Sequence, residues 1–443
     1  MKETPTQLNL PGVPRAKQGR EVAPEWAWTE ASVWTERMLA TLERGIQGGK
    51  WYSLMDKVWS QSNLESAVKQ VCQNKGSAGI DGQSTEALRR KSQTILPRIQ
   101  EQLRTGQYEP QPAKRQWIEK PGSKELRPLG IPTVQDRTVE TALRNVIEPI
   151  FEHDFAAHSY GFRPGRGAKD ALRRVNQLLH SGRTWIVDAD LKGYFDSIPQ
   201  DQLMEALTRK ISDGAVLDLI QRFLKQGVME SAQEWKPTEQ GTPQGAVISP
   251  LLANIYLDPF DHLMARAGWE LVRYADDFVV LCVSEEEARK ALEQIQQWVT
   301  SVGLVLHPTK TRIVDATQKG GFDFLGYHFE RGLKWPRKKS QEKLKETIRQ
   351  KTRRTNGKSL GQIIAEVNRT LKGWFTYFKH SQKSAFGDLD SWIRGRLRAI
   401  LRKRHHLSGW VRMRDHKLWP NAYFVEHGLF SMATARAKAS QPQ

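Results

Sequence analysis

Two adjacent aspartates, Asp276 and Asp277, stand inside the segment YADDFVVLC, whose other residues are mostly apolar. Neighbouring carboxylates are disfavoured in a strand, because they repel each other and have low strand propensity. The pair is therefore typical either of a tight turn between two strands or of a site that binds a cation. A second apolar segment, WIVDADLKGYFDSI, also carries acids, at Asp188 and Asp190.

Two neighbouring strands that each bring an aspartate to one point would make a site for hard divalent cations. Mg²⁺ prefers oxygen ligands in octahedral geometry and keeps several of its waters. Two such ions, roughly 4 Å apart, stabilise both the attacking and the leaving oxygen of a phosphoryl displacement. These acids therefore predict phosphoryl-transfer chemistry with two Mg²⁺ ions, for which Mn²⁺ can substitute.

Further motifs surround these acids in a fixed order. They are SYGFRPGRG (159–167), VDADLKGYFDSI (187–198), QGTPQGAVISPLLANIYL (240–257), YADD (274–277) and LVLHPTKT (304–311). Together they resemble a group II intron reverse transcriptase, also called an intron-encoded maturase, of the bacterial type without an endonuclease. The resemblance runs from about residue 54 to about residue 430. It implies an RNA-directed DNA polymerase that makes cDNA, binds intron RNA and assists its splicing and mobility.

The resemblance also assigns the metal ligands. It implies that Asp190, Asp276 and Asp277 hold the metal ions and that the carbonyl of Leu191 touches one of them. In the family pattern Asp188 is a supporting residue rather than a ligand.

Two further positions are implied to act on the nucleotide. Lys310, in HPTKT, matches the position that could protonate the pyrophosphate leaving group, and an exposed loop charge is the alternative. Phe195 should lie against the sugar and exclude a 2′-hydroxyl, so that deoxynucleotides are preferred; core packing is the alternative. Asp196 is expected to cap the next turn.

An incoming triphosphate (a dNTP) needs basic groups facing its phosphates. In the segment KPGSKELRPLG the family pattern selects Lys120 and Arg127, although Lys124 could replace either. In GTPQG the amide of Gln244 is expected to contact the nucleotide, and Gly245 to let the backbone approach nucleotide and template.

Other residues are implied to hold template and primer. Arg163 and Arg166 are expected to clamp the template backbone or support the fingers, with a purely structural turn as the alternative. Leu325 and Gly326, in FLGYHF, resemble the segment that holds the primer end, although a buried strand is also expected there.

The positive charge is concentrated in the last quarter of the chain. The net charge is +19, yet residues 331–443 hold 27 Lys/Arg and 7 Asp/Glu, whereas residues 1–330 hold 41 and 42. Such asymmetry is typical of a polyanion-binding appendage, with a solvated basic surface as the alternative. Arg394 and Arg398 lie in this basic part and are expected to bind template–primer through phosphates and duplex shape.

Strands and helices mix without regular alternation, so the fold class is expected to be α+β. Strands are expected at 184–191, 273–283, 304–315 and 322–330, and helices at 85–104, 135–151, 285–303, 333–355, 360–380 and 389–406. The resemblance implies a right-hand polymerase, with fingers and an antiparallel palm sheet before a helical thumb. The expected divisions are a flexible leader (1–24), an N-terminal extension with fingers (25–184), a palm (185–332), a thumb or maturase domain (333–406) and a basic, aromatic tail (407–443).

Composition excludes several other classes of protein. Only two cysteines are present, at 72 and 282, so a disulfide framework or a CxxC zinc site is excluded. No apolar run of 18 residues and no secretory signal is found, which predicts a soluble protein of the bacterial cytoplasm with no membrane partner. The tail holds only His416 and His427 and no cysteine, so a zinc-type endonuclease is not expected and a mobile intron would prime on an existing 3′ end.

The expected partners are intron RNA, an RNA template with a DNA primer, dNTPs and target DNA, and the sequence indicates no oligomeric state. Two alternatives stay open. One is a related reverse transcriptase that works without an intron, in defence, spacer capture or repair. The other is an RNA-binding splicing maturase with little polymerase activity. The tail could contact DNA or pack on the thumb.

Overall fold

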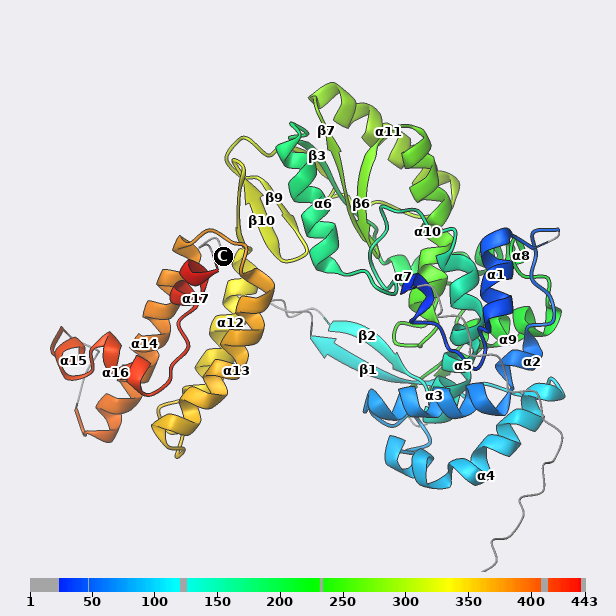
Figure 1. The fold of residues 1–443 in the computed structure, drawn as a ribbon, viewed down its shortest axis with the longest axis horizontal. Coiled ribbons are helices and arrows are strands. Elements are labelled where there is room, and N and C mark those ends of the chain that lie inside the picture. Colours follow the sequence, from blue (N-terminus) through cyan, green and yellow to red (C-terminus); the bar gives the residue numbers. More distant parts are fainter. Residues whose placement is uncertain (1–23, 47, 120–125, 232–233, 408–412, 440–443) are drawn as a thin grey trace, which may run out of the picture.

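The structure, a computed structural model of the chain, describes residues 24–46, 48–119, 126–231, 234–407 and 413–439. The expected leader lies outside the described residues apart from Pro24, and so do Lys120 and Lys124. Figure 1 shows a body of mixed sheets and helices beside a bundle of helices, which we call the C-terminal bundle (α12–α17). The expected α+β class with an antiparallel central sheet and a helical C-terminal region is confirmed.

The N-terminal part of the body is mainly helical. Its helices are η1 (Pro24–Trp26), α1 (Glu36–Arg44), α2 (Met55–Val58), α3 (Gln61–Gln73), α4 (Thr85–Arg104) and α5 (Val134–Glu152). An N-terminal sheet in the order β2-β1-β4-β5 lies beside them (Figure 1). Its strands are β1 (Ala113–Glu119), β2 (Leu126–Ile131), β4 (Val228–Ser231) and β5 (Glu234–Lys236). Strands β1 and β2 pair antiparallel.

The central sheet is antiparallel and has the order β6-β7-β3-β8. Its strands are β3 (Trp185–Asp190), β6 (Glu270–Tyr274), β7 (Asp277–Cys282) and β8 (Arg312–Asp315). Helices α6 (Ala168–His180), α10 (Ser249–Arg266) and α11 (Glu285–Ser301) pack against it. The same part of the chain also forms α7 (Tyr194–Ser197), α8 (Gln200–Thr208) and α9 (Gly214–Lys225). The single strand expected at 273–283 is a hairpin, since β6 and β7 are joined by a turn at Ala275 and Asp276.

Both faces of the central sheet are covered. Side chains alternate along a strand, and Ile186 and Val279 accordingly pack in a cluster with α6 residues. Their neighbours Val187 and Val280 pack in the cluster that contains α11 residues. Burial on both faces explains why the strands read as nearly continuous apolar runs, in which an acid is conspicuous.

A third sheet connects the body to the C-terminal bundle. It has the order β11-β10-β9, and its strands are β9 (Phe322–Phe324), β10 (Tyr327–Glu330) and β11 (Leu333–Pro336). The expected helix at 333–355 therefore starts later, at Lys338, because the first four residues pair with β10.

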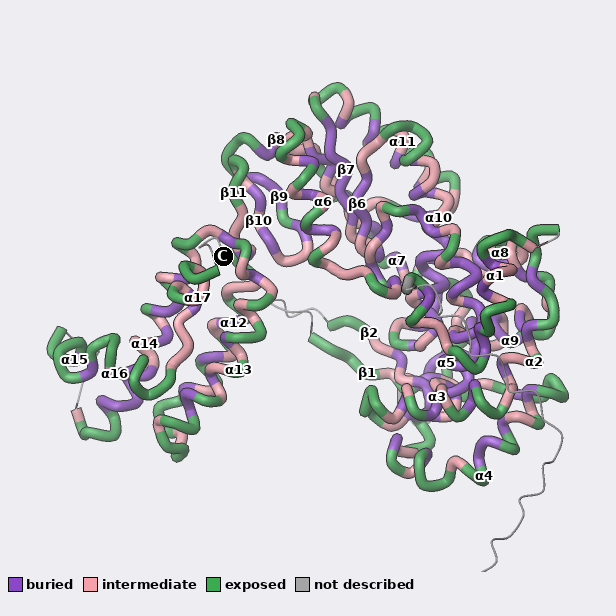
Figure 2. Tube along the Cα trace, in the orientation of Figure 1, coloured by how far each residue is buried: buried purple, intermediate pink, exposed green. Residues whose placement is uncertain are grey.

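The C-terminal bundle has its own buried cluster, as the purple inner sides of its helices show (Figure 2). Its helices are α12 (Lys338–Lys351), α13 (Leu360–Phe378), α14 (Ser384–Arg404), α15 (Met413–Leu418), α16 (Asn421–Glu426) and α17 (Met432–Lys438). Trp419, Phe424 and Met432 of the tail belong to this cluster. The carboxylate of Asp390 in α14 accepts hydrogen bonds from Ser431, Met432 and Ala433 at the start of α17. The described part of the tail therefore packs on α14, and packing on the thumb was one of the two expected alternatives.

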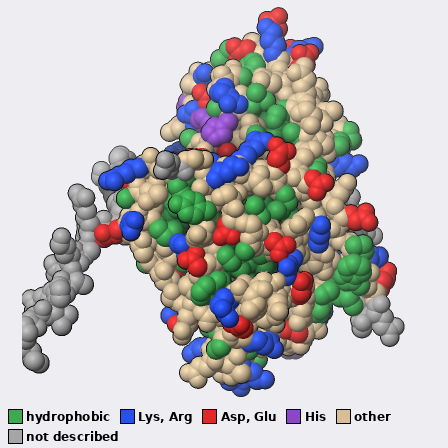
Figure 3. Space-filling view, turned by 90° about the vertical axis from the view of Figure 1, so that its right-hand side faces the viewer, with side chains coloured by type: hydrophobic (Ala, Val, Ile, Leu, Met, Phe, Trp, Pro, Cys, Tyr) green, Lys and Arg blue, Asp and Glu red, His purple; other side chains and the backbone are tan. Residues whose placement is uncertain are grey.

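Basic and acidic side chains are interspersed on the face of the body that Figure 3 presents. This agrees with the nearly neutral charge of residues 1–330. None of the helices in the described ranges is long and apolar enough to cross a membrane.

Candidate active site

Asp190 and Asp277 are direct partners in the central sheet, because β3 and β7 pair antiparallel with these residues in register. Asp276 precedes Asp277 in the turn between β6 and β7, where Ala275 has a φ of 60°. The aspartate pair thus lies in a tight turn and also at the same sheet edge as a third carboxylate. The tight turn and the candidate cation site, the two alternatives for this pair, are therefore the same place in the structure.

Burial and mutual repulsion disfavour ionisation of the carboxyl groups at this edge. Burial, with the charges of Asp188, Asp276 and Asp190, raises the pKa of Asp277 to about 7. Burial, and then the charge of Asp190, also raise the pKa of Asp276. The carboxyl groups are therefore near enough to disfavour one another's ionisation.

A divalent cation would relieve that repulsion, and carboxylate oxygens are the donors it prefers. Within the described ranges, no three His, Cys, Asp or Glu side chains are already arranged around one point as a metal site. The donor chemistry fits divalent cations, although the side chains would have to converge further to ligate one.

A lysine faces these carboxylates. Nζ of Lys310 lies 2.5 Å from Oδ2 of Asp190 and forms an ion pair with it. The backbone amide of His307, in the same loop, donates to the Asp190 carbonyl at 2.7 Å. Lys310 is exposed at the protein surface, so its ammonium is accessible to a ligand bound at the sheet edge.

The remaining acids of β3 and α7 have other partners. Oδ2 of Asp188 accepts from Nε of Arg312 at 3.2 Å across the β3–β8 pair, while burial raises its pKa to about 6. Leu191 forms an isolated antiparallel bridge with Leu306. The two hydrogen bonds of this bridge run from the His307 amide to the Asp190 carbonyl and from the Lys192 amide to the Val305 carbonyl.

The loop that contains Gln244 and Gly245 closes one side of the site. Nε2 of Gln244 donates to Oδ2 of Asp196 at 2.9 Å, so its amide is held by the protein. The carbonyl of Gln244 accepts from the amide of Gly130 in β2 at 2.7 Å. A Cβ on Gly245, which has a φ of 111°, would lie 2.3 Å from the Gly130 carbonyl, so only glycine fits this close approach.

Glu140 of α5 contacts the segment that follows Gln244 and Gly245. Its side chain is fully buried, and Oε2 accepts from the amide of Val247 at 2.9 Å. Burial raises the pKa of Glu140 to about 8. Nothing in the sequence motifs singled out this residue.

Two aromatic rings lie beside the aspartates. Phe195 in α7 is partly buried, which falls between the expected roles of gate and core residue. Phe162 is 49% exposed and has a φ of 58°. Its ring centroid lies 6.4 Å from that of Phe195 and 6.5 Å from that of Tyr274. Phe162 stands within SYGFRPGRG, but it was not among the expected site residues.

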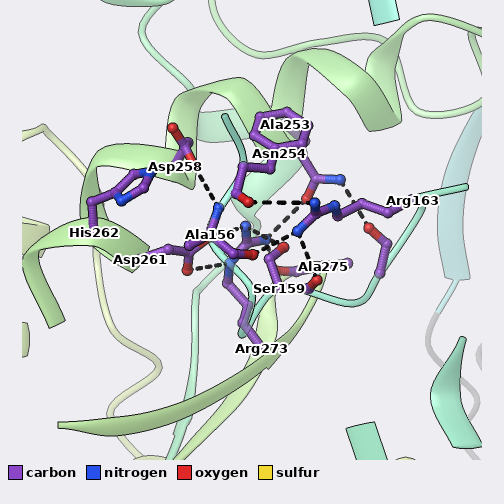
Figure 4. Close-up of polar contacts among 12 residues, drawn as sticks. Ala156, Ser159, Arg163, Ala253, Asn254, Asp258, Asp261, His262, Arg273 and Ala275 are labelled. Atoms are coloured by element: carbon purple, nitrogen blue, oxygen red, sulfur yellow. Dashed lines mark hydrogen bonds and ion pairs between the residues drawn. The ribbon is translucent and has the colours of Figure 1, made fainter. Parts of the chain in front are cut away.

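Arg273, the residue before the YADD motif, holds the turn from behind (Figure 4). It is 1% exposed and forms an ion pair with Asp261 of α10, to which its Nε donates at 2.7 Å. Nη1 donates to the carbonyl of Ala275 at 2.9 Å and to Oδ1 of Asn254 at 3.0 Å, and Nη2 donates to Oγ of Ser159 at 2.8 Å. A cation directly after the apolar residues Leu271 and Val272 is the signal that could have identified this residue.

Arg163 is internal rather than exposed to a template. Its guanidinium forms an ion pair with Glu152. It also donates to the carbonyls of Ala156 and Ser159 (Figure 4). The structure therefore supports the structural alternative for Arg163 and not the template clamp. Arg166 is half-buried and donates to the carbonyl of Ala157 at 2.7 Å.

The expected primer segment is the turn between β9 and β10. Leu325 and Gly326 both have positive φ, of 45° and 85°. The hydroxyl of Tyr377 in α13 donates to the Leu325 carbonyl at 2.7 Å, and the amide of Arg337 donates to the Gly326 carbonyl at 2.9 Å. The C-terminal bundle thus holds this turn directly.

The expected basic contacts differ in their exposure. Arg127 in β2 is exposed, and its charge opposes the burial effect that raises the pKa of Asp276. Arg394 is partly exposed and donates to Oγ of Ser391 at 3.0 Å. Arg398 is 2% exposed, and it donates to the Trp419 carbonyl and to Oδ1 of Asn421. The structure therefore does not support a nucleic-acid contact for Arg398, whose role is to attach the tail to α14.

Two protein families match this chain. "Reverse transcriptase (RNA-dependent DNA polymerase)" matches residues 118–329, and "Group II intron, maturase-specific domain" matches residues 341–419. The first match contains the central sheet with its carboxylates, and the second begins in α12 and ends just after α15.

Individual proteins are also similar to this chain. Protein YkfC of Escherichia coli (strain K12) is 33% identical over 347 residues, which cover 69% of this chain and 86% of that protein. Group II intron-encoded protein LtrA of Lactococcus lactis subsp. cremoris is 40% identical over 202 residues, 45% of this chain and 33% of LtrA. The match thus spans about a third of the length of LtrA. A match to a chain of the solved structure "Partial Cas6-RT-Cas1--Cas2 complex" covers 56% of this chain and 41% of that chain, with 25% sequence identity and a TM-score of 0.35.

Proposed function

The chain belongs to the family of group II intron-encoded reverse transcriptases and maturases, and we propose that it copies RNA into DNA by two-metal nucleotidyl transfer. The expectation of an RNA-directed DNA polymerase with a maturase domain is confirmed by this membership. One observation carries the mechanistic proposal: Asp190, Asp276 and Asp277 lie together at one edge of the central sheet, inside the matched polymerase region.

The family uses divalent metal ions, and we propose Mg²⁺ here, with Mn²⁺ as a substitute. Asp190, Asp276 and Asp277 would hold two ions, with the carbonyl of Leu191 as a further ligand. When bound, such ions lower the pKa of a primer 3′-hydroxyl and neutralise the triphosphate. Burial and the neighbouring carboxylates raise the pKa of Asp277 to about 7, so bound cations would favour the ionised form that ligates them.

Other residues of the site orient the substrates and transfer protons. Arg127, exposed on β2, would bind the triphosphate, and Lys120 would do so from the neighbouring segment that lies outside the described residues. Lys310 would give a proton to the departing pyrophosphate, since its Nζ already lies against Asp190. Phe195 would face the sugar and exclude a 2′-hydroxyl.

Binding of RNA follows from the two families, and we propose that the bound RNAs are a template paired with a DNA primer and the host intron. The C-terminal bundle carries the basic surplus of the chain, including the partly exposed Arg394. Its phosphate contacts would serve either duplex without base readout. Target DNA would be the further partner in mobility, and the bacterial cytoplasm the place of action.

The test is primer extension by the purified protein on an RNA template with a DNA primer, Mg²⁺ and dNTPs. We expect cDNA from the unmodified protein and none from Asp276→Ala, with RNA binding retained in both. Absence of cDNA from the unmodified protein would contradict the polymerase proposal.

Splicing is tested separately with a group II intron transcript that contains this coding frame. We expect both the unmodified protein and Asp276→Ala to accelerate splicing, because the maturase domain matches residues 341–419, away from the carboxylates. A coding frame without flanking intron RNA would instead favour a reverse transcriptase that works without an intron.

A further inference from the structure

Phe162 is a large apolar side chain held in an unfavourable position. It is 49% exposed, and its φ of 58° lies in the left-handed region that bulky residues rarely adopt. Strained backbone of this kind costs free energy and persists only where surrounding contacts impose it. Such contacts are present on both sides of Phe162.

The residues next to Phe162 are fixed firmly to the body. On one side, Nδ2 of Asn254 donates to the carbonyl of Gly161 at 2.8 Å. A Cβ on Gly161 would lie 2.3 Å from the amide nitrogen of Ala275, so this backbone packs directly on the aspartate turn. On the other side, Arg163 is anchored by Glu152 and two carbonyls (Figure 4).

These anchors leave the ring of Phe162 facing the edge of the site. Its centroid lies 6.4 Å from that of Phe195, with an interplanar angle of 78°, which is an edge-to-face contact. Tyr274, the first residue of the YADD motif, lies on another side at 6.5 Å. Phe162 is therefore the exposed member of an aromatic group beside the carboxylates.

Phe195 cannot move away freely on its other side. Its ring contacts that of Tyr194 at 5.7 Å, and its carbonyl accepts from the amide of Thr242 at 2.7 Å. The edge-to-face contact places the ring of Phe162 on one side of the Phe195 ring. A ring at position 162 therefore blocks displacement of the Phe195 ring in that direction.

We propose that Phe162 is a specificity-determining residue that restrains Phe195, so that the two rings form one wall against the sugar of the incoming nucleotide. This inference rests on the proposed function and on the role of Phe195 as a gate. A ribonucleotide needs extra space for its 2′-hydroxyl, and loss of either ring creates that space.

The experiment measures the ratio of kcat/KM for a dNTP to that for the matching rNTP, on one RNA template and DNA primer. Phe162→Ala is expected to lower this selectivity about three- to tenfold, the range of one aromatic pair. Phe195→Ala should lower it further, and adding Phe162→Ala to Phe195→Ala should have no additional effect. Tyr52→Ala is the control, because it removes an aromatic ring that is 66% exposed and lies outside the sequence motifs. It should leave selectivity unchanged.

Phe162→Gly separates the ring from the backbone, because glycine adopts positive φ without strain. We expect Phe162→Gly to be at least as stable as Phe162→Ala in urea unfolding, yet to lose the same selectivity. If the variants still make cDNA, either of two results would overturn the inference. One is unchanged selectivity in Phe162→Ala, and the other is a full additional loss of selectivity in the double variant. Failure of the unmodified protein to make cDNA would overturn the proposed function and this inference together.

Discussion

Nζ of Lys310 lies 2.5 Å from Oδ2 of Asp190, which links the loop after α11 to the strand that carries a proposed metal ligand. The contact spans 120 residues of sequence. It places a proton donor beside the edge where pyrophosphate would leave, so Lys310 has a stronger claim to a chemical role than an isolated loop charge.

Lys310→Ala should lower kcat about 100-fold, at the lower end of what general acids contribute, while KM for dNTP changes little. Lys310→Arg keeps the charge but cannot give up a proton near neutral pH. It should therefore stay about as slow as Lys310→Ala in single-nucleotide incorporation. Full activity of Lys310→Arg would reduce the role of Lys310 to charge alone.

Arg273 should position the aspartate turn, because its guanidinium joins Asp261, Asn254 and Ser159 to the Ala275 carbonyl. Arg273→Lys keeps the charge but cannot reach all of these groups. We expect a loss of stability below the 3–5 kcal/mol typical of a broken buried pair, with kcat reduced about tenfold or more. Mn²⁺ binding by the folded protein, followed by electron paramagnetic resonance, should also weaken.

Arg402→Lys is the matched control, since Arg402 forms a buried ion pair with Asp415 in the C-terminal bundle. It should lose stability without a change in Mn²⁺ affinity. Equal Mn²⁺ affinity in Arg273→Lys and the unmodified protein would show that Arg273 only stabilises the fold.

The sequence pattern could predict that the carboxylates lie at one edge of the sheet, but not which residues hold them there. The apolar runs around Asp190 and Asp277 predict two strands, and antiparallel pairing brings these residues into register. The division of 273–283 into two strands depends on the positive φ of Ala275. The adjacent aspartates indicate such a turn as one alternative. The hydrogen bond from Arg273 to the Ala275 carbonyl, and the partner Asp261 that holds Arg273, could not be predicted from a local pattern.

Two arginines show why a role in nucleic-acid binding is hard to predict from sequence. Arg163 and Arg398 stand in basic, motif-rich segments and look available for phosphate. Their partners are Glu152 and backbone carbonyls in one case, and the Trp419 carbonyl in the other. Because these partners lie 11 and 21 residues away and are partly backbone, charge patterning cannot distinguish a buried guanidinium from an exposed one.

Glu140 should make stability depend on pH. Its folded pKa of about 8 lies above the usual 4.5, so the folded protein holds this proton more tightly than the unfolded chain. The resulting stabilisation is complete below about pH 4.5 and is lost as pH rises toward 8. Glu140→Gln keeps an acceptor for the Val247 amide but does not titrate.

The free energy of unfolding, measured in urea at pH 5.5, 6.5 and 7.5, should therefore fall more steeply in the unmodified protein than in Glu140→Gln. The difference in slope should approach about 1.4 kcal/mol per pH unit, the value for one proton. Parallel slopes would mean that Glu140 ionises normally in the folded protein.

The C-terminal bundle should bind template–primer duplexes only through its exposed Lys and Arg side chains. Arg394→Glu with Lys403→Glu reverses two of them, both at least partly exposed on α14. The slope of log affinity against log salt for template–primer should become shallower by about two units. Arg398→Gln should instead lower stability and leave the salt slope unchanged, because its guanidinium is internal; an equal change in slope would place Arg398 at the interface.

The central claim is that Asp190, Asp276 and Asp277 act together in nucleotidyl transfer, and single-turnover incorporation of one dNTP onto a primer paired with RNA tests it most directly. Each Asp→Asn variant at these positions should react at least about 1,000-fold more slowly, a barrier increase of about 4 kcal/mol, while template–primer affinity stays within about threefold. Asp201→Asn, at an exposed position on α8, should react at the normal rate. If any of the three variants incorporates nucleotide at a rate near that of Asp201→Asn, the account of the site is contradicted.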